Sequence, residues 1–96
     1  MQAATLQFMI DRDAPEPLYV QLADVLTEQI RTGGLAPRRM IPSETTLAQT
    51  YGVNRLTARK AVRLLRQRGL IATVVGKGSY VRPREQWPDE GTDDAG

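Results

Sequence analysis

The chain has 96 residues, no cysteine, no histidine and a formal net charge of +2. We therefore expect one small domain without disulfides, thiolate zinc sites or the most common general base, and we expect neither catalysis nor a cofactor. Because no apolar run approaches the ~20 residues of a membrane helix and the N-terminus lacks the features of a signal peptide, we expect a cytoplasmic protein that contacts no membrane.

The first third of the chain predicts a lead-in, a helix and a loop. Residues 1–16 are expected to be an extended lead-in, because they run into a Pro-Glu-Pro sequence that disfavours a helix. Apolar side chains then recur at helical intervals, which predicts a first helix over 17–32 that the next two glycines end. The loop over 35–42 contains two prolines, and we expect a short strand at Met40 and Ile41.

A second helix is predicted over 44–51. Ser43 supplies a hydroxyl to cap its first turn, and an acidic residue follows where the helix dipole favours negative charge. Leu47 and Ala48 are expected to face inward. Gly52 can adopt the left-handed conformation that ends a helix abruptly, so a tight turn should follow.

The third helix, over 55–68, has the strongest amphipathic pattern. Asn54 can cap its first turn, and Gly69 stops it. Its apolar stripe consists of Ala58, Ala61, Val62 and Leu65. The opposite face consists of Leu56, Arg59, Lys60 and Arg63. One face is therefore core and the other basic, whereas Arg66 and Arg68 near the end either complement the helix dipole or bind a partner.

The sequence after the third helix predicts a β-hairpin. Two extended runs, 70–75 and 79–82, flank the glycine-bounded turn 76–78. Beyond them the chain is polar and acidic and lacks periodicity, so 84–96 are expected to be a disordered tail or linker that includes Trp87. This tail either competes with a polyanion for the basic surface or only improves solubility. The expected core includes Tyr51, Leu65, Leu70 and Tyr80.

The order of these elements predicts a mainly α fold with a small β-hairpin, the winged helix-turn-helix of three helices plus a wing, over 17–83. The charge distribution indicates its partner. Residues 31–84 carry twelve basic side chains and one acidic side chain, a local net charge of +11, whereas the rest of the chain carries −9. A compact basic surface of this kind is typical of proteins that bind nucleic acid.

In a helix-turn-helix the second helix lies in the major groove of DNA, so Arg55 and Arg59 are expected to read base edges. Leu56 can contact a thymine methyl group, and the wing tip can enter the adjacent minor groove. Polar groups at the helix starts can bind phosphates. The candidate DNA-binding residues are Ser43, Glu44, Thr45, Asn54, Arg55, Leu56, Thr57, Arg59, Lys60, Arg63, Gly76, Lys77 and Gly78.

The runs PLYVQLADVLTEQIRTGGLAP, IPSETTLAQTYGVNRLTARKAVRLLRQRGLI and GKGSYV resemble the DNA-binding domain of the GntR family of bacterial transcription regulators, and the opening run resembles its HutC and YtrA branches. The resemblance implies a repressor that binds a palindromic operator in double-stranded DNA as a homodimer until a small effector binds a separate C-terminal domain. That effector domain is absent from these 96 residues. By position, Arg55 and Arg59 match the arginines of the family's recognition helix. Gly76 matches the glycine at the wing tip, and Ser43 and Glu44 match the proline-serine-glutamate turn.

The chain departs from the family pattern at several of these positions. Thr45 stands where a base-contacting arginine is common, which puts one guanine contact in doubt. Asn54 replaces a serine and keeps the capping function, whereas Leu56 replaces a small hydroxyl residue and loses a phosphate contact. Arg38 stands where glycine is typical.

The sequence leaves two alternatives to DNA binding. A winged helix can serve as a protein-interaction module, in which case the basic helix would bind an acidic protein. The sequence disfavours this function, because the third helix exposes almost no apolar side chain that could anchor a protein interface. An enzyme would need a nucleophile and a base, and the sequence offers no recognisable pair.

Overall fold

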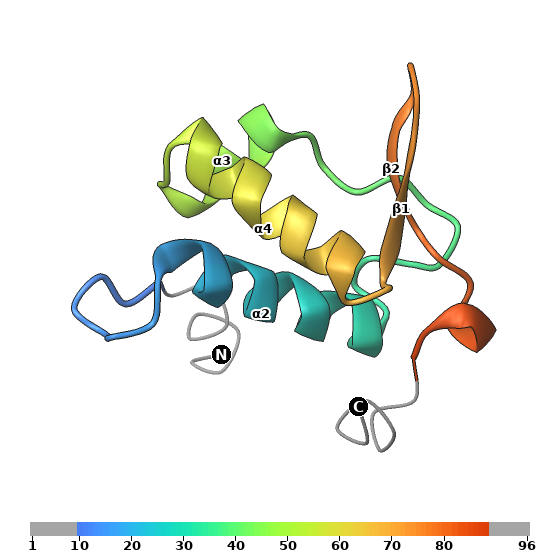
Figure 1. Ribbon diagram of the computed structural model, residues 1–96, viewed down its shortest axis with the longest axis horizontal. Coiled ribbons are helices and arrows are strands. Elements are labelled where there is room, and N and C mark those ends of the chain that lie inside the picture. The colour runs from blue at the N-terminus through green and yellow to red at the C-terminus, as the bar shows by residue number, and fades with distance from the viewer. Residues whose placement is uncertain (1–9, 89–96) are drawn as a thin grey trace.

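The computed structural model describes residues 10–88, which form three α-helices and a two-stranded hairpin (Figure 1). The elements in chain order are α2 (Leu18–Thr32), α3 (Glu44–Tyr51), α4 (Arg55–Gln67), β1 (Ile71–Val74), β2 (Gly78–Val81) and the short 3-10 helix η1 (Arg84–Gln86). The predicted fold of three helices plus a wing is confirmed. Within residues 10–88 no helix has the length and apolarity needed to cross a membrane.

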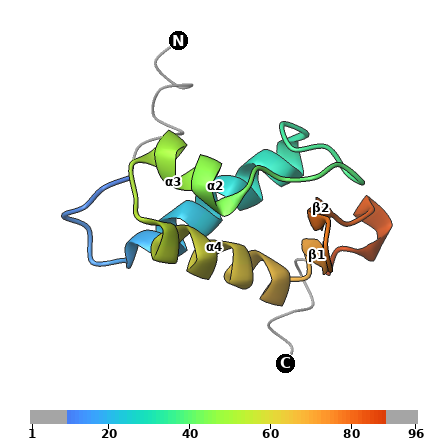
Figure 2. The ribbon, with the colours of Figure 1, turned by 90° about the horizontal axis from the view of Figure 1, so that it is seen from above.

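The core forms where α2 and α3 pack against the apolar stripe of α4 (Figure 2). All four predicted stripe residues of α4 are buried, and Ala58 and Ala61 are completely inaccessible to solvent. Because alanine has a small side chain, these two positions let the neighbouring helices approach α4 closely. The buried residues of the other two helices are Leu22, Ala23, Leu26 and Ile30 of α2 and Leu47 and Ala48 of α3.

Side-chain caps fix the start of both helices in the helix-turn-helix, as predicted. The Oγ of Ser43 accepts a hydrogen bond from the backbone N–H of Thr46 at 3.1 Å. The Oδ1 of Asn54 accepts one from the backbone N–H of Thr57 at 2.7 Å. Between them Gly52 ends α3 with a φ of 69°, a conformation that glycine adopts without strain. Gly52 and Asn54 together make the turn between α3 and α4 tight.

The lead-in differs from the expected extended segment, because residues 12–16 form turns and bends next to the start of α2 (Figure 1). The side chain of Gln21 holds them in place. Its Nε2 donates to the carbonyl oxygens of Asp11 and Glu16 at 2.9 and 2.8 Å, and its Oε1 accepts from the N–H of Asp11 at 2.8 Å. The sequence pattern missed this structure because a single glutamine supplies the bonds that a regular element would otherwise make. Residues 1–9 lie outside the described part of the chain.

The hairpin is antiparallel and its turn lies one residue earlier than predicted. Gly78 pairs with Val74 and is the first residue of β2, so the turn consists of residues 75–77. The short strand expected at Met40 and Ile41 is reduced to one bridge, between Met40 and Tyr80. Tyr80 is half-buried beside this bridge and is not part of the core, which corrects its predicted position.

The prediction that order ends at Pro83 is wrong for residues 84–88. They form η1, and Trp87 packs against the core while its Nε1 donates to the carbonyl oxygen of Arg82 at 2.7 Å. The guanidinium of Arg84 lies 4.9 Å from the centre of the indole ring. These side-chain contacts hold residues 84–88 in place without any periodic pattern, which is why the sequence did not indicate this structure. The rest of the expected tail, 89–96, lies outside the described residues.

Candidate nucleic-acid interface

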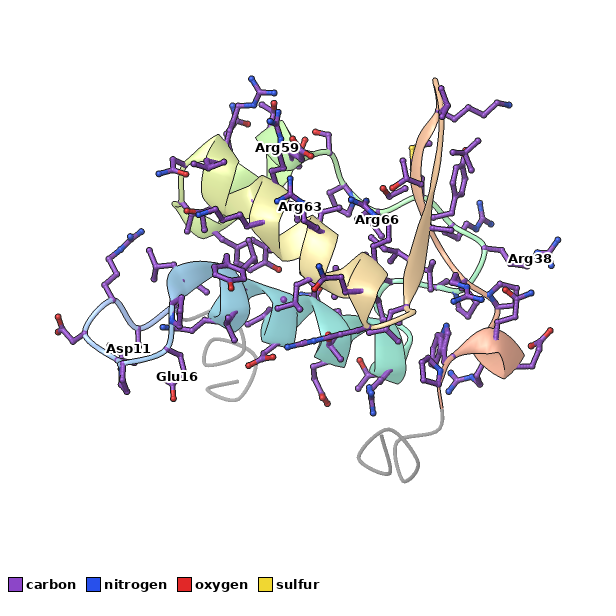
Figure 3. All side chains as sticks on the ribbon, viewed as in Figure 1. Asp11, Glu16, Arg38, Arg59, Arg63 and Arg66 are labelled. Carbon is purple, nitrogen blue, oxygen red and sulfur yellow. The ribbon has the colours of Figure 1, made fainter. Side chains whose placement is uncertain are left out.

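An open groove lies between the first turn of α3, one face of α4 and the hairpin. Eight of the predicted DNA-binding residues line it: Ser43, Glu44, Thr45, Arg55, Arg59, Arg63, Lys77 and Gly78. Arg59, Arg63 and Arg66 follow one another along the face of α4 that is turned toward this groove (Figure 3). Four arginines of α4 and one lysine of the hairpin therefore face a common space in which, among residues 10–88, Glu44 is the one acidic side chain. This arrangement favours a polyanionic ligand.

The arginines at the start of α4 are exposed and one of them is oriented by α3. Arg55 is exposed at the first helical position. The side chain of Arg59 is 52% exposed, and its Nε donates to Oε1 of Glu44 at 3.3 Å. This ion pair occupies Nε alone, so the two terminal nitrogens of the guanidinium remain available for a bidentate contact with a base or a phosphate.

The other predicted residues of the helix-turn-helix lie beside the groove and do not line it. Asn54, Leu56 and Thr57 belong to the capped start of α4 but do not line the groove, although Leu56 is 56% exposed. Lys60 points toward α2, where its Nζ lies 5.9 Å from the centre of the Tyr19 ring. None of these four residues therefore lines the groove together with Arg59.

The wing tip is open and can approach a ligand closely. The N–H of Lys77 donates to the carbonyl oxygen of Val74 at 2.9 Å and closes the turn. Gly76 has a φ of 80°, and a Cβ atom at this position would meet no other atom within 4 Å. Glycine is thus required here for its backbone conformation and not for lack of space. Val75 beside it is 96% exposed.

Sequence reasoning missed several residues that line the groove. They are Met40, Ile41, Pro42, Val62, Arg66, Thr73 and Ser79. Of these, Arg66 had a detectable signal, because it continues the i, i+4, i+7 spacing of Arg59 and Arg63 along one helix face. The two hairpin hydroxyls had none, since only the strand register shows which side of the hairpin they occupy.

Arg68 has a structural role on the far side of α4. Its guanidinium donates to Oδ1 of Asp24 and to Oγ1 of Thr27, both at 2.9 Å. These bonds tie the end of α4 to α2, outside the groove. Arg66, in contrast, points toward the hairpin, so the two arginines left open by the sequence have different functions.

Among residues 10–88, no cluster of three or more carboxylate side chains could hold a metal ion.

Tyr51 lies outside the groove and packs against the core. Burial raises the pKa of its hydroxyl above the ordinary value of 10.0, and a hydrogen bond from Gln29 opposes this effect. The groove itself offers cationic and hydroxyl groups that are suited to binding a ligand.

Comparisons with known proteins identify the fold. The chain is 40% identical over 67 residues to the mannosyl-D-glycerate transport/metabolism system repressor MngR of Escherichia coli, which covers 70% of this chain and 28% of the relative. YtrA from Sulfolobus acidocaldarius, described as a GntR-family transcription factor, superimposes with a TM-score of 0.73 at 36% identity and covers 80% of this chain and 81% of that one. The AraR DNA-binding domain, solved in complex with operator ORX1, superimposes with a TM-score of 0.68 at 33% identity. This match covers 76% of this chain and 94% of that one.

The chain spans less than a third of the length of the curated relatives it matches, as the shares of 28%, 31% and 30% show. The match to the family described as "Bacterial regulatory proteins, gntR family" covers residues 18–81, which extends from the first residue of α2 to the last residue of β2. This range contains the helix-turn-helix and the whole wing. The chain therefore belongs to the gntR family of bacterial regulatory proteins.

Proposed function

We propose that this chain is the DNA-binding part of a transcription regulator and that it recognises a specific sequence in double-stranded DNA. The observation that carries this proposal is the groove, where the arginines of α4 and Lys77 of the hairpin face one open space. The similarity to the AraR DNA-binding domain, which was solved with operator DNA, supports the same conclusion.

The geometry suggests how the contacts are divided. Arg55 and Arg59 lie in the first two turns of α4, the part of a recognition helix that reaches base edges, and each can make two hydrogen bonds to a guanine. Arg63 lies farther along the same helix, and Thr45 lies at the start of α3. In our proposal these two residues and Ser43 bind phosphates and fix the register of the helix on the duplex.

The wing makes a second set of contacts in this proposal. The turn between β1 and β2 projects beyond the helices (Figure 1). Gly76 and Lys77 belong to this turn, so they can enter the minor groove adjacent to the major groove that holds α4. Gly78 allows the strand to pass close to Met40, since a Cβ atom there would lie 3.0 Å from its sulfur. Leu56 and Lys60, which lie beside the groove, contact the DNA at the edge of the site. Leu56 contacts a thymine methyl group, and Lys60 contacts the phosphate backbone of the DNA.

The start of α4 supplies one further phosphate contact in this proposal. Asn54 and Thr57 lie where the unpaired N–H groups of a helix N-terminus favour an anion. The Asn54 amide already satisfies the N–H of Thr57, so the contact uses the neighbouring N–H groups and the Thr57 hydroxyl.

We further infer that the protein is a cytoplasmic repressor that binds a palindromic operator as a homodimer. Several similar relatives carry the word repressor in their names, including MngR and NagR. A single helix-turn-helix reads only a short half-site, and two copies related by a two-fold axis would read a palindrome. Response to a small effector would require a domain outside these 96 residues.

Selection of bound duplexes from a random DNA pool tests this function directly. The proposal predicts enrichment of a palindrome whose half-sites are separated by about one or two helical turns, roughly 10 or 20 base pairs. Equal recovery of all sequences would contradict sequence recognition. Absence of any DNA binding, together with capture of an acidic protein, would favour the protein-interaction module instead.

A further inference from the structure

Three polar side chains cross the floor of the groove between α4 and the hairpin. Nη1 of Arg66 donates to Oγ1 of Thr73 at 2.7 Å, and Oγ1 of Thr73 lies 2.9 Å from Oγ of Ser79. Thr73 and Ser79 are directly paired across the hairpin. A continuous chain of hydrogen bonds therefore joins the last turn of α4 to both strands of the wing.

The wing needs such a connection because little of it is buried. In β1 only Ile71 is buried, and the next three residues are exposed. In β2 only Val81, the partner of Ile71, is buried. The core thus holds the base of the hairpin alone, and a two-stranded hairpin is marginally stable without further contacts. The bond from Arg66 to Thr73 attaches the wing to α4 two residues above this buried base.

Ser79 is also fixed from the opposite direction. Its carbonyl oxygen accepts a hydrogen bond from the N–H of Ile41 at 2.9 Å. Ile41 is buried and is followed, after one proline, by the residue that caps α3. At the other end of the groove Glu44 connects α3 to Arg59. Contacts therefore connect all the elements that surround the groove, and Arg66 provides the connection between α4 and the wing.

We infer that Arg66 is a positioning residue for DNA binding, which acts through Thr73 and Ser79 to set the distance and angle between α4 and the wing. This inference rests on the proposed function. Major and minor grooves of a duplex are separated by a fixed distance, so the helix and the wing can bind together only if they are held at the matching spacing. If the helix and the wing already have this spacing in the free protein, less conformational entropy is lost on association with DNA.

The inference separates Arg66 from the arginines that contact DNA directly. A residue that only neutralises a phosphate contributes through its charge, and removal of its hydrogen-bond partner would leave binding unchanged. A positioning residue depends on that partner. Replacement of Thr73 therefore tests the role of Arg66 without altering the charge of the groove.

The experiment compares Thr73→Val, which loses the hydroxyl, with Thr73→Ser, which keeps it, on the duplex obtained by selection from a random pool. Thr50→Val, at an exposed position of α3 outside the groove, is the matched control. We expect Thr73→Val to weaken binding by about three- to tenfold, which is within the range for the loss of one typical hydrogen bond. Thr73→Ser and the control should stay within about twofold of the wild type. Thermal unfolding of each variant verifies that the domain remains folded.

A double-mutant cycle with Lys77→Ala shows whether the effect passes through the wing. If Thr73 positions the wing, Lys77→Ala should cause a smaller fold-loss in the Thr73→Val background than in the wild type, because the misplaced tip has already lost part of its contact. An equal fold-loss in both backgrounds, or a Thr73→Val variant that binds like the wild type, would overturn the inference. A wild-type chain that selects no sequence would instead contradict the proposed function, and the positioning role with it.

Discussion

Glu44 and Arg59 form an ion pair that joins the first turn of α3 to the second turn of α4, with Oε1 3.3 Å from Nε. Both side chains are partly exposed, at 32% and 52%, so the pair contributes little to the stability of the fold. Its consequence is geometric. Because Nε is held by the carboxylate, the guanidinium is oriented toward the groove before a ligand arrives.

The first prediction concerns this pair. Glu44→Gln should reduce the preference for operator over random duplex by about three- to tenfold, because Arg59 loses the charge-assisted bond that orients it. Binding to random DNA should stay equal or become tighter, since one negative charge is removed from the groove. Fluorescence anisotropy on both duplexes measures the two effects. Glu28→Gln on α2, outside the groove, is the control, and an unchanged preference for operator would contradict an orienting role.

The second prediction concerns Lys77 at the wing tip. Lys77→Ala should weaken operator and random duplex by similar factors, because a lysine beside the minor groove interacts mainly with the backbone. The slope of log K against log salt concentration should decrease by about 1, the value for one lost phosphate contact. Titrations at several salt concentrations measure this slope. A slope equal to that of the wild type would mean that the tip does not contact DNA.

The third prediction uses the cap of α4 to separate folding from binding. Asn54→Ala should lower the free energy of unfolding by about 1 kcal/mol, because the N–H of Thr57 loses its acceptor. Asn54→Asp keeps an acceptor and adds a charge that the helix dipole favours, so stability should be retained. Urea denaturation measures both variants. On DNA the aspartate should bind more weakly than the wild type, and unaltered affinity would show that phosphates do not approach this helix end.

The fourth prediction concerns pH. Burial raises the pKa of Tyr51 in the folded protein above its ordinary value of 10.0. The unfolded chain then releases this proton at lower pH than the folded chain, so the contribution of Tyr51 to stability is complete below pH 10 and is lost as pH rises above it. Tyr51→Phe should flatten this part of the stability curve. Identical slopes for both proteins above pH 10 would contradict the effect of burial.

Local patterns in the sequence predicted the three helices and the hairpin because the chain marks their ends clearly. Ser43 and Asn54 cap helices that begin at the predicted residues, and Gly52 ends α3 as expected. The contacts that were missed depend on the tertiary fold. Trp87 packs against the core and donates a hydrogen bond to the carbonyl oxygen of Arg82, and no periodic pattern reveals such contacts.

Only part of the groove was predicted, because some of its residues are marked by local charge and position whereas others are brought together only by the tertiary fold. Arg55, Arg59 and Lys77 were identified by charge and position, and the structure brings them together. Lys60 belongs to the same basic sequence, but the helical rotation turns it toward Tyr19. The interaction between Arg66 and the hairpin hydroxyls could not be predicted, because it requires both the strand register and the side of the hairpin that faces α4.

The central claim is that α4 reads bases with its leading arginine. Affinities of Arg55→Ala for the selected operator and for random duplex, measured at the same salt concentration, test it most directly. Arg39→Ala, an exposed arginine outside the groove, controls for the loss of one positive charge. We predict that Arg55→Ala lowers the preference for operator by about 1–3 kcal/mol, while the Arg39 variant leaves it unchanged. An equal loss of affinity for both duplexes would contradict base recognition by Arg55.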